Sequence, residues 1–193
     1  VGTKNSPYLI STETQMRTIG TNTYNGKYLY YKQINDITVT TLTSKRFYHV
    51  AYFQGEYDGD GYYVSVSETH SDANGAVLFY KANKNAVVKN INVVSHENCA
   101  FSVFYDLTGG FATSVTLQNI TTSCKDGKTV KANAGNMGFF AQNPIYNTSS
   151  HQQTIIFENC VNKANLENSG TCSAAFIGSG YCSGYKYLTS SSE

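Results

Sequence analysis

Three short stretches of the chain, VVKNINV (residues 87–93), TLQNITT (116–122) and IFENCVN (156–162), place an asparagine at the same position of an irregular repeat. An apolar or aromatic block precedes each of them (AVLFY, FSVFY and GFFAQ), and AAFIG begins a fourth copy. The distances between copies are unequal. Strands of fixed length joined by turns of free length produce this pattern, so the repeat predicts a solenoid in which each copy stacks on the previous one.

The repeated positions predict which side chains build such a stack. Asn90, Asn119 and Asn159 are expected to bend the strand, because asparagine tolerates the left-handed backbone region, and to hydrogen-bond one another as a structural ladder. An inward column of rings is expected to fill the core. Its predicted members are Phe79, Phe104, Phe139 and Phe176.

Most of the remaining sequence alternates β-branched or aromatic residues with polar ones, separated by NG, DG and GG turns, which predicts an all-β domain. The exception is TETQMRTIG (residues 12–20), where Thr12 and Gln15 form a capping box and Gly20 is a suitable stop. We therefore expect a single domain over residues 1–193, with a cap and short helix in 1–34 and coils in 35–193. The helix is expected to cover the open sheet edge.

Four segments together resemble a known group, the right-handed parallel β-helix repeat domains of secreted and cell-surface proteins from bacteria and some protists. They are GTKNSPYLISTETQMRTIG (2–20), NGKYLYYKQINDITV (25–39), FQGEYDGDGYYV (53–64) and NGAVLFYKANKNAVVKNINVV (74–94). The match is close over about 95 residues and continues only as a repeat pattern after them, where the regular G-G-L-hydrophobic-G blocks are missing. The resemblance implies a right-handed parallel β-helix in an extracellular setting. Hosts of this fold include adhesins, passenger domains and polysaccharide-cleaving enzymes, so it leaves the function open.

Charge and hydropathy exclude several classes of protein. Lys and Arg number 14 against 13 Asp and Glu, a net charge of +1, so no strong field attracts nucleic acid. No stretch approaches the ~18 apolar residues of a membrane helix, and no membrane insertion is expected within the chain. The abrupt ends suggest a piece of a longer protein. No cofactor is expected.

Five cysteines lack any zinc-ligand spacing. Two disulfides and one unpaired thiol are expected, with Cys172 close enough in sequence to pair with Cys182 and Cys99 within reach of Cys124; five reduced cysteines are the alternative. Cys160 replaces the isoleucine of the other repeats, so we expect it to be the buried, unpaired thiol. Two sequons, at Asn119 and Asn147, predict glycosylation sites.

The acidic residues are thinly spread. Asp58 and Asp60 alternate with Gly59 and Gly61, which allows a calcium loop, half of a catalytic acid pair or a tight turn. Calcium needs ~6–8 oxygen ligands, which the following residues do not supply. We favour a turn in which both glycines adopt positive φ and the aspartates cap backbone N–H groups. A carbohydrate-active enzyme, either a lyase or a glycoside hydrolase, using Asp58 or Asp60 with Asp36 is the alternative.

Tyrosines suggest a binding role. Aromatic residues make up 13% of the chain, with 16 Tyr and no Trp. Tyrosines occupy both odd and even positions of the strands near residues 28–31 and 62–63. Successive side chains of a strand point to opposite faces, so some of these tyrosines must face outward. Tyr30, Tyr62 and Tyr63 are the predicted ligand-binding residues. The expected function is adhesin-like recognition of a glycan or a host or cell-surface protein, outside the cell or at its surface; a purely structural scaffold is a further alternative.

Overall fold

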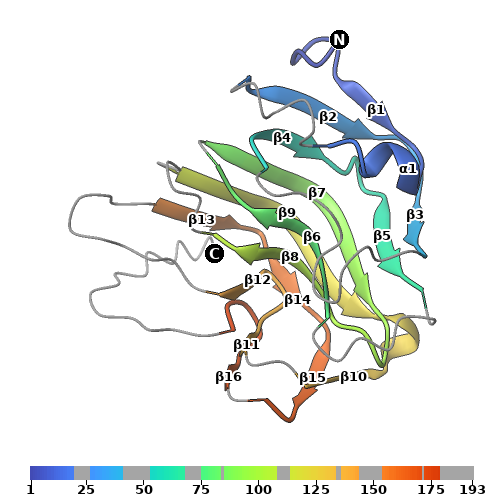
Figure 1. Cartoon of the computed structure of the whole chain (residues 1–193), viewed down its shortest axis with the longest axis vertical. Coiled ribbons are helices and arrows are strands. Elements are labelled where there is room, and N and C mark those ends of the chain that lie inside the picture. The colour runs from blue at the N-terminus through green and yellow to red at the C-terminus, as the bar shows by residue number, and fades with distance from the viewer. Residues whose placement is uncertain are drawn as a thin grey trace.

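The structure is a computed structural model, and it describes residues 1–19, 27–40, 53–67, 75–83, 85–107, 114–133, 136–143, 154–170 and 172–178. The chain is mostly β-strand, with parallel sheets and little helix, as expected of the all-β class (Figure 1). Wherever two of the described strands pair, they run parallel, so the chain returns repeatedly to the same side of the molecule before it forms the next strand.

The largest sheet contains two adjacent columns of parallel strands. The first column runs in the order β1 (Tyr8–Ile10), β2 (Leu29–Gln33), β4 (Gly55–Asp58), the first half of β7 (Ala86–Ser95), the first half of β9 (Ser114–Cys124) and β13 (Thr154–Glu158). The second column consists of β3 (Ile37–Val39), β5 (Tyr63–Val66), the second halves of β7 and β9, and β14 (Val161–Asn162). β7 and β9 thus run unbroken through both columns.

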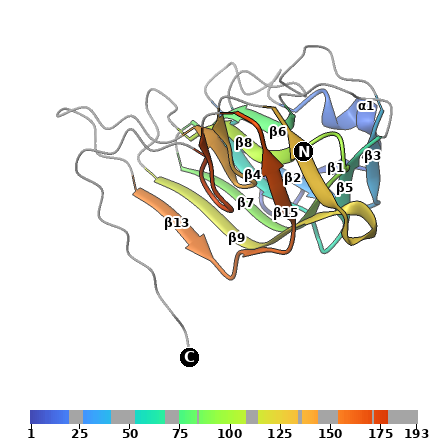
Figure 2. The same cartoon turned by 90° about the horizontal axis from the view of Figure 1, so that it is seen from below.

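A third column stands opposite the first. It consists of β6 (Ala76–Lys81), β8 (Phe101–Asp106) and β12 (Ala141–Asn143). Two smaller pairs complete the structure, β10 (Thr129–Ala132) with β15 (Asn165–Asn168) and β11 (Asn136–Met137) with β16 (Cys172–Ser173); the 3-10 turn η2 (Lys125–Gly127) links β9 to β10. In Figure 2, β7, β9 and β13 lie across from β6 and β8.

The predicted helix forms only in part. α1 spans Glu13–Met16, four residues, and begins at the N-cap Thr12, whose hydroxyl accepts the N–H of Gln15 at 3.2 Å. The side-chain oxygen of Gln15 accepts the N–H of Ser11 at 2.7 Å, one residue before the N-cap, so only the Thr12 half of the predicted capping box forms. Gly20 lies outside the described residues. β2, within the predicted cap segment, pairs with both β1 and β4, so these two strands of the cap segment belong to the sheet.

The core between the columns contains a run of aromatic rings in contact, two of the contacts stacked and two tilted. Tyr8, Tyr31, Phe53, Phe79 and Phe104 follow one another with ring centroids 5.7, 6.3, 4.1 and 5.6 Å apart. Burial of these large side chains contributes to the hydrophobic stabilisation of the fold. The run begins earlier than the sequence predicts, because β1 and β2 also contribute rings.

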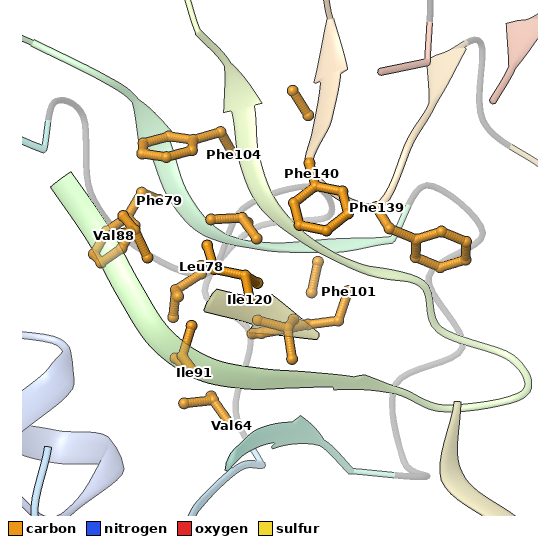
Figure 3. Packing of buried hydrophobic residues seen from close by; sticks show 14 of the residues in the cluster. Val64, Leu78, Phe79, Val88, Ile91, Phe101, Phe104, Ile120, Phe139 and Phe140 are labelled. Carbon is orange, nitrogen blue, oxygen red and sulfur yellow. The ribbon is translucent and has the colours of Figure 1, made fainter. Parts of the chain in front are cut away.

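Two members of the predicted phenylalanine column, Phe139 and Phe176, are wrong, because Ala141 and Ile177 occupy the positions that continue Phe79 and Phe104. The ring that stacks on Phe176 belongs to Phe140, at 4.5 Å, whereas Phe139 is buried elsewhere in the core (Figure 3). The predicted strand GFFAQ forms only from Ala141, which pairs with Phe104. Phe139 and Phe140 therefore both precede the regular strand, where alternation of side chains no longer holds, and neither continues the column in register.

Candidate functional site

The three repeat asparagines form a continuous ladder at the bend between the first and second columns. Each has a positive φ, +53° at Asn90 and +51° at Asn119 and Asn159. The Nδ2 of Asn119 donates to Oδ1 of Asn90 at 3.0 Å, and the Nδ2 of Asn159 donates to Oδ1 of Asn119 at 3.2 Å. These amides are occupied in holding successive bends together, which assigns them a structural role.

Asp58 extends this ladder by one step. Its Oδ1 accepts the Nδ2 of Asn90 at 3.0 Å and also the N–H of Asp60 at 3.0 Å. Sequence alignment missed this relation because the bend between β4 and β5 is two residues longer than the bend in β7: Asp58 pairs with Lys89 and Tyr63 with Asn92. The Asp-Gly-Asp-Gly stretch is thus an enlarged form of the asparagine bend.

The prediction for the glycines of this bend is half right. Gly61 has φ +86°, but the second positive φ belongs to Asp60, at +51°, and not to Gly59. Gly59 is required for a different reason: a Cβ there would lie 2.6 Å from both the carbonyl oxygen of Asn90 and the Cβ of Ile91. It allows two backbones to approach closely, the other common use of glycine.

The acids of the enzymatic alternative are all engaged in holding the chain. Asp36 accepts the N–H of Tyr63 at 3.0 Å, and Asp60 forms an ion pair with Lys32 at 3.1 Å. In the part of the chain that the structure describes, no group of three or more His, Cys, Asp or Glu side chains is placed to hold a metal ion. The arrangement at the bend therefore supports capping and pairing rather than acid–base chemistry.

Charges on the outer face of the first column are paired as well. Lys89 contacts the carboxylates of both Glu56 and Asp58, the latter at 3.6 Å. Burial lowers the pKa of Lys89, but the hydrogen bond and charge of Glu56, followed by those of Asp58, outweigh it and hold the pKa above its ordinary value. Beyond them, Gln118 donates to Glu158 at 3.0 Å. Polar side chains on this face thus link neighbouring strands, β4 to β7 through Lys89 and β9 to β13 through Gln118.

A hollow lined by tyrosines lies at the N-terminal end of the first column. It has a volume of about 660 Å³ and is lined by Val1, Gly2, Thr3, Tyr8, Lys27, Tyr28, Leu29 and Tyr30. β2 places Tyr30 on the outer side, opposite the buried Tyr31, and the rings of Tyr28 and Tyr30 meet edge to face with centroids 5.4 Å apart. In the described part of the chain, the hollow brings Tyr30, a predicted ligand-binding residue, together with other aromatic and polar side chains.

Tyr28 is fixed in this hollow. Its hydroxyl donates to the backbone oxygen of Asn85 at 2.9 Å, which anchors the ring from the start of β7. Burial, the carboxylate of Glu56 and the neighbouring Tyr30 together raise the pKa of Tyr28 to about 12. The phenol thus stays neutral throughout the physiological range. A preorganised, uncharged aromatic surface loses little conformational entropy when a ligand stacks on it.

The other two predicted tyrosines lie elsewhere. Tyr63, 40% exposed, stands on β5 beyond the bend, beside Asn92 of β7, and Tyr62 is half-buried next to it. No ring contact joins either of them to Tyr30 within the described ranges. The structure therefore separates the predicted set into two places. Neither Tyr8 nor Lys27 was predicted from the sequence to belong to the site. An alignment of PYLI (residues 7–10) with YYKQ (residues 30–33) would have identified Tyr8, because it places Tyr8 beside Tyr31, as in the structure.

The predicted disulfide between Cys99 and Cys124 is not formed, since both side chains are thiols. The residue beside Cys124 in the neighbouring strand is Ser95, and Cys99 follows only after the turn at His96. Cys160 is also a thiol, partly rather than fully buried, and its Sγ donates to the backbone oxygen of Leu117 at 3.2 Å. Cys182 lies outside the described residues, and so does any bridge from Cys172 to it.

The glycosylation sites remain predictions. Asn119 is exposed, although its amide belongs to the ladder, and Asn147 lies outside the described residues. As for the membrane, none of the described helices is long and apolar enough to cross one.

Comparison with known proteins adds no relative: no family model, curated protein or solved structure matches the chain. Function must therefore be inferred from the geometry of the site.

Proposed function

We propose that the chain is a right-handed parallel β-helix that acts as an extracellular or cell-surface recognition module, adhesin-like, and binds glycan through the tyrosine hollow. The fold proposal is supported by the repeated return of the chain to three parallel columns and by the asparagine ladder. Parallel crossovers within a sheet are right-handed in about 98% of cases, which supports the handedness.

The single observation that carries the binding proposal is the tyrosine pair in the hollow. The ring planes of Tyr28 and Tyr30 meet at an angle of 67°, so a ligand in the hollow would meet two aromatic surfaces of different orientation. Sugar rings present apolar C–H faces rimmed by hydroxyls, and a neutral aromatic wall with polar neighbours matches both features. Lys27 and Thr3 provide those polar neighbours at the rim of the hollow.

A glycan array on the intact chain tests the proposal, with Tyr30→Ala as the informative variant. We expect the array to identify a bound glycan, and its affinity to fall about tenfold or more when Tyr30 is truncated, corresponding to ~1.4 kcal/mol. Tyr63→Ala is the matched control, because it removes an exposed tyrosine from outside the hollow. Equal losses in both variants would remove the hollow from the proposal.

The same preparation separates binding from catalysis. Incubation with the glycans that bind, followed by a reducing-sugar assay, is expected to release no product. Released sugar would favour the carbohydrate-active alternative, and then Asp36→Asn, Asp58→Asn and Asp60→Asn show which carboxylates are involved. Absence of any ligand on the array would leave the scaffold alternative.

A further inference from the structure

The first 35 residues of the chain carry an excess of positive charge. In a chain whose net charge is only +1, they contain a single acidic residue, Glu13, and the basic residues Lys4, Arg17, Lys27 and Lys32. Arg17 pairs with Glu13 at 2.8 Å, and Lys32 pairs with Asp60 at 3.1 Å. Within the described residues, Lys4 and Lys27 have no carboxylate partner. Of these two, Lys27 lines the tyrosine hollow.

Lys27 sets the charge of the hollow. It is the only charged side chain among the described residues that line the hollow. Residues 20–26, which lead into Lys27, contain no Asp or Glu. The carboxylate of Glu56 acts on Tyr28, but it contacts the ammonium of Lys89, which balances its charge. The electrostatic potential in the hollow is therefore positive and favours an anionic group.

The hollow also offers hydrogen-bond donors that the fold does not use. The Tyr28 hydroxyl donates to the backbone oxygen of Asn85. In the described part of the chain, the hydroxyls of Tyr8 and Tyr30 and the ammonium of Lys27 have no hydrogen-bond partner. An ammonium only donates, and an ionised carboxylate or sulfate only accepts, so the two match. Hydrogen bonds between such charged groups are among the stronger ones in proteins.

We propose that the tyrosine hollow binds an acidic glycan, whose carboxylate or sulfate group lies beside Lys27 while its sugar ring stacks on Tyr30. The inference rests on the proposed function and specifies which glycans the hollow selects. The volume of about 660 Å³ falls within the ~300–1,000 Å³ of typical ligand sites, which leaves room for the ring and its acidic substituent. A neutral sugar can use the tyrosines, but it gains nothing from the charge of Lys27.

Matched pairs of glycans on one array test the proposal: sialylated and asialo oligosaccharides, uronic acid oligosaccharides and their carboxyl-reduced forms, and sulfated and unsulfated oligosaccharides. We expect an acidic member to bind about threefold or more tightly than its neutral counterpart at low salt. The difference should shrink as added salt screens the exposed charge of Lys27.

Calorimetric titration of the pair that binds best assigns this preference to a residue. Lys27→Gln should weaken binding of the acidic member alone and so remove the difference, whereas Lys27→Arg should keep it. Lys163→Gln is the matched control, because it removes the same charge from an exposed residue that follows β14, outside the hollow. It should leave the difference unchanged.

The outcomes separate failure of the inference from failure of the proposed function. If no glycan binds, or if Tyr30→Ala leaves binding unchanged, both fail together. If binding depends on Tyr30 but acidic and neutral members bind equally, or if Lys27→Gln weakens both members to the same extent, only the inference is overturned. Equal losses in Lys27→Gln and Lys163→Gln would also overturn it, since they would trace the preference to the net charge of the chain.

Discussion

Asn119 donates its side-chain amide to Asn90 across 3.0 Å, and both residues have a positive φ. A residue at this bend must tolerate the left-handed backbone region and must hydrogen-bond the turns on either side. Asparagine does both, because its side-chain amide carries a donor and an acceptor. The bend between the two columns is therefore fixed by side chains and backbone together.

Replacement of Asn119 separates these two contributions. Asn119→Gly removes the amide but keeps the positive φ, whereas Asn119→Ala removes the amide and also strains the backbone. We expect Ala to lower the free energy of unfolding by about 1 kcal/mol more than Gly does. Urea denaturation measures the difference. Asn92→Ala, on the neighbouring strand β7 and without a positive φ, should cost less than either; equal stability of the Ala and Gly variants would contradict the account.

The close approach at Gly59 predicts a clash. Gly59→Ala places a methyl group against the backbone oxygen of Asn90, and backbone cannot move aside as a flexible side chain can. The expected loss is about 2–3 kcal/mol in the free energy of unfolding. Gly127→Ala is the control, because Gly127 has φ +66° but open space around it, so that only strain of about 1 kcal/mol applies. Thermal unfolding of the two variants should rank them in this order.

The raised pKa of Tyr28 predicts a dependence of stability on alkaline pH. The folded value of about 12 exceeds the ordinary 10.0, so the folded state holds this proton more tightly than the unfolded state does. The resulting stabilisation is complete below pH 10 and disappears as the pH rises from 10 to 12. Ultraviolet titration of the wild type minus Tyr28→Phe should show one phenol ionising near pH 12. A difference curve centred at 10 would contradict the burial of Tyr28.

The state of the cysteines predicts their reactivity. Burial raises the pKa of Cys124 and of Cys160, and the thiolate is the reactive form, so both should react slowly with a thiol reagent at neutral pH. Unfolding without reductant should expose Cys99, Cys124 and Cys160 to rapid labelling, which peptide mass spectrometry can assign. A peptide in which Cys99 is linked to Cys124 would restore the disulfide prediction.

The sequence predicts best where side chains repeat at fixed spacing. The strands around Asn90 and Asn119, the N-cap at Thr12 and the inward position of Phe104 all follow from local patterns that the structure shows. The placement of Phe139 beside Phe104 failed because the register there depends on where β12 begins, at Ala141, which side-chain alternation does not encode. Positions set by packing against a distant backbone are missed in the same way, as at Gly59.

The candidate site was harder to predict than the fold. Tyr30 is identified by strand parity alone, but the hollow also needs Tyr8 from β1, and nothing local to Tyr30 shows which strand lies beside it. The ladder position of Asp58 depends on a bend of different length, which a gap-free alignment of the repeats does not reveal.

The enlarged bend at residues 59–62 shows how the molecule accommodates additional length. Parallel pairing is regular on both sides of it, at Asp58 with Lys89 and at Tyr63 with Asn92, so the extra residues bulge outward without displacing either column. A Cβ at Gly61 would meet no atom within 4 Å, so the tip of the bend is unobstructed. This position is therefore suited to protein engineering: a foreign epitope inserted between Asp60 and Gly61 would be displayed on the surface, while the strands beneath it keep their register.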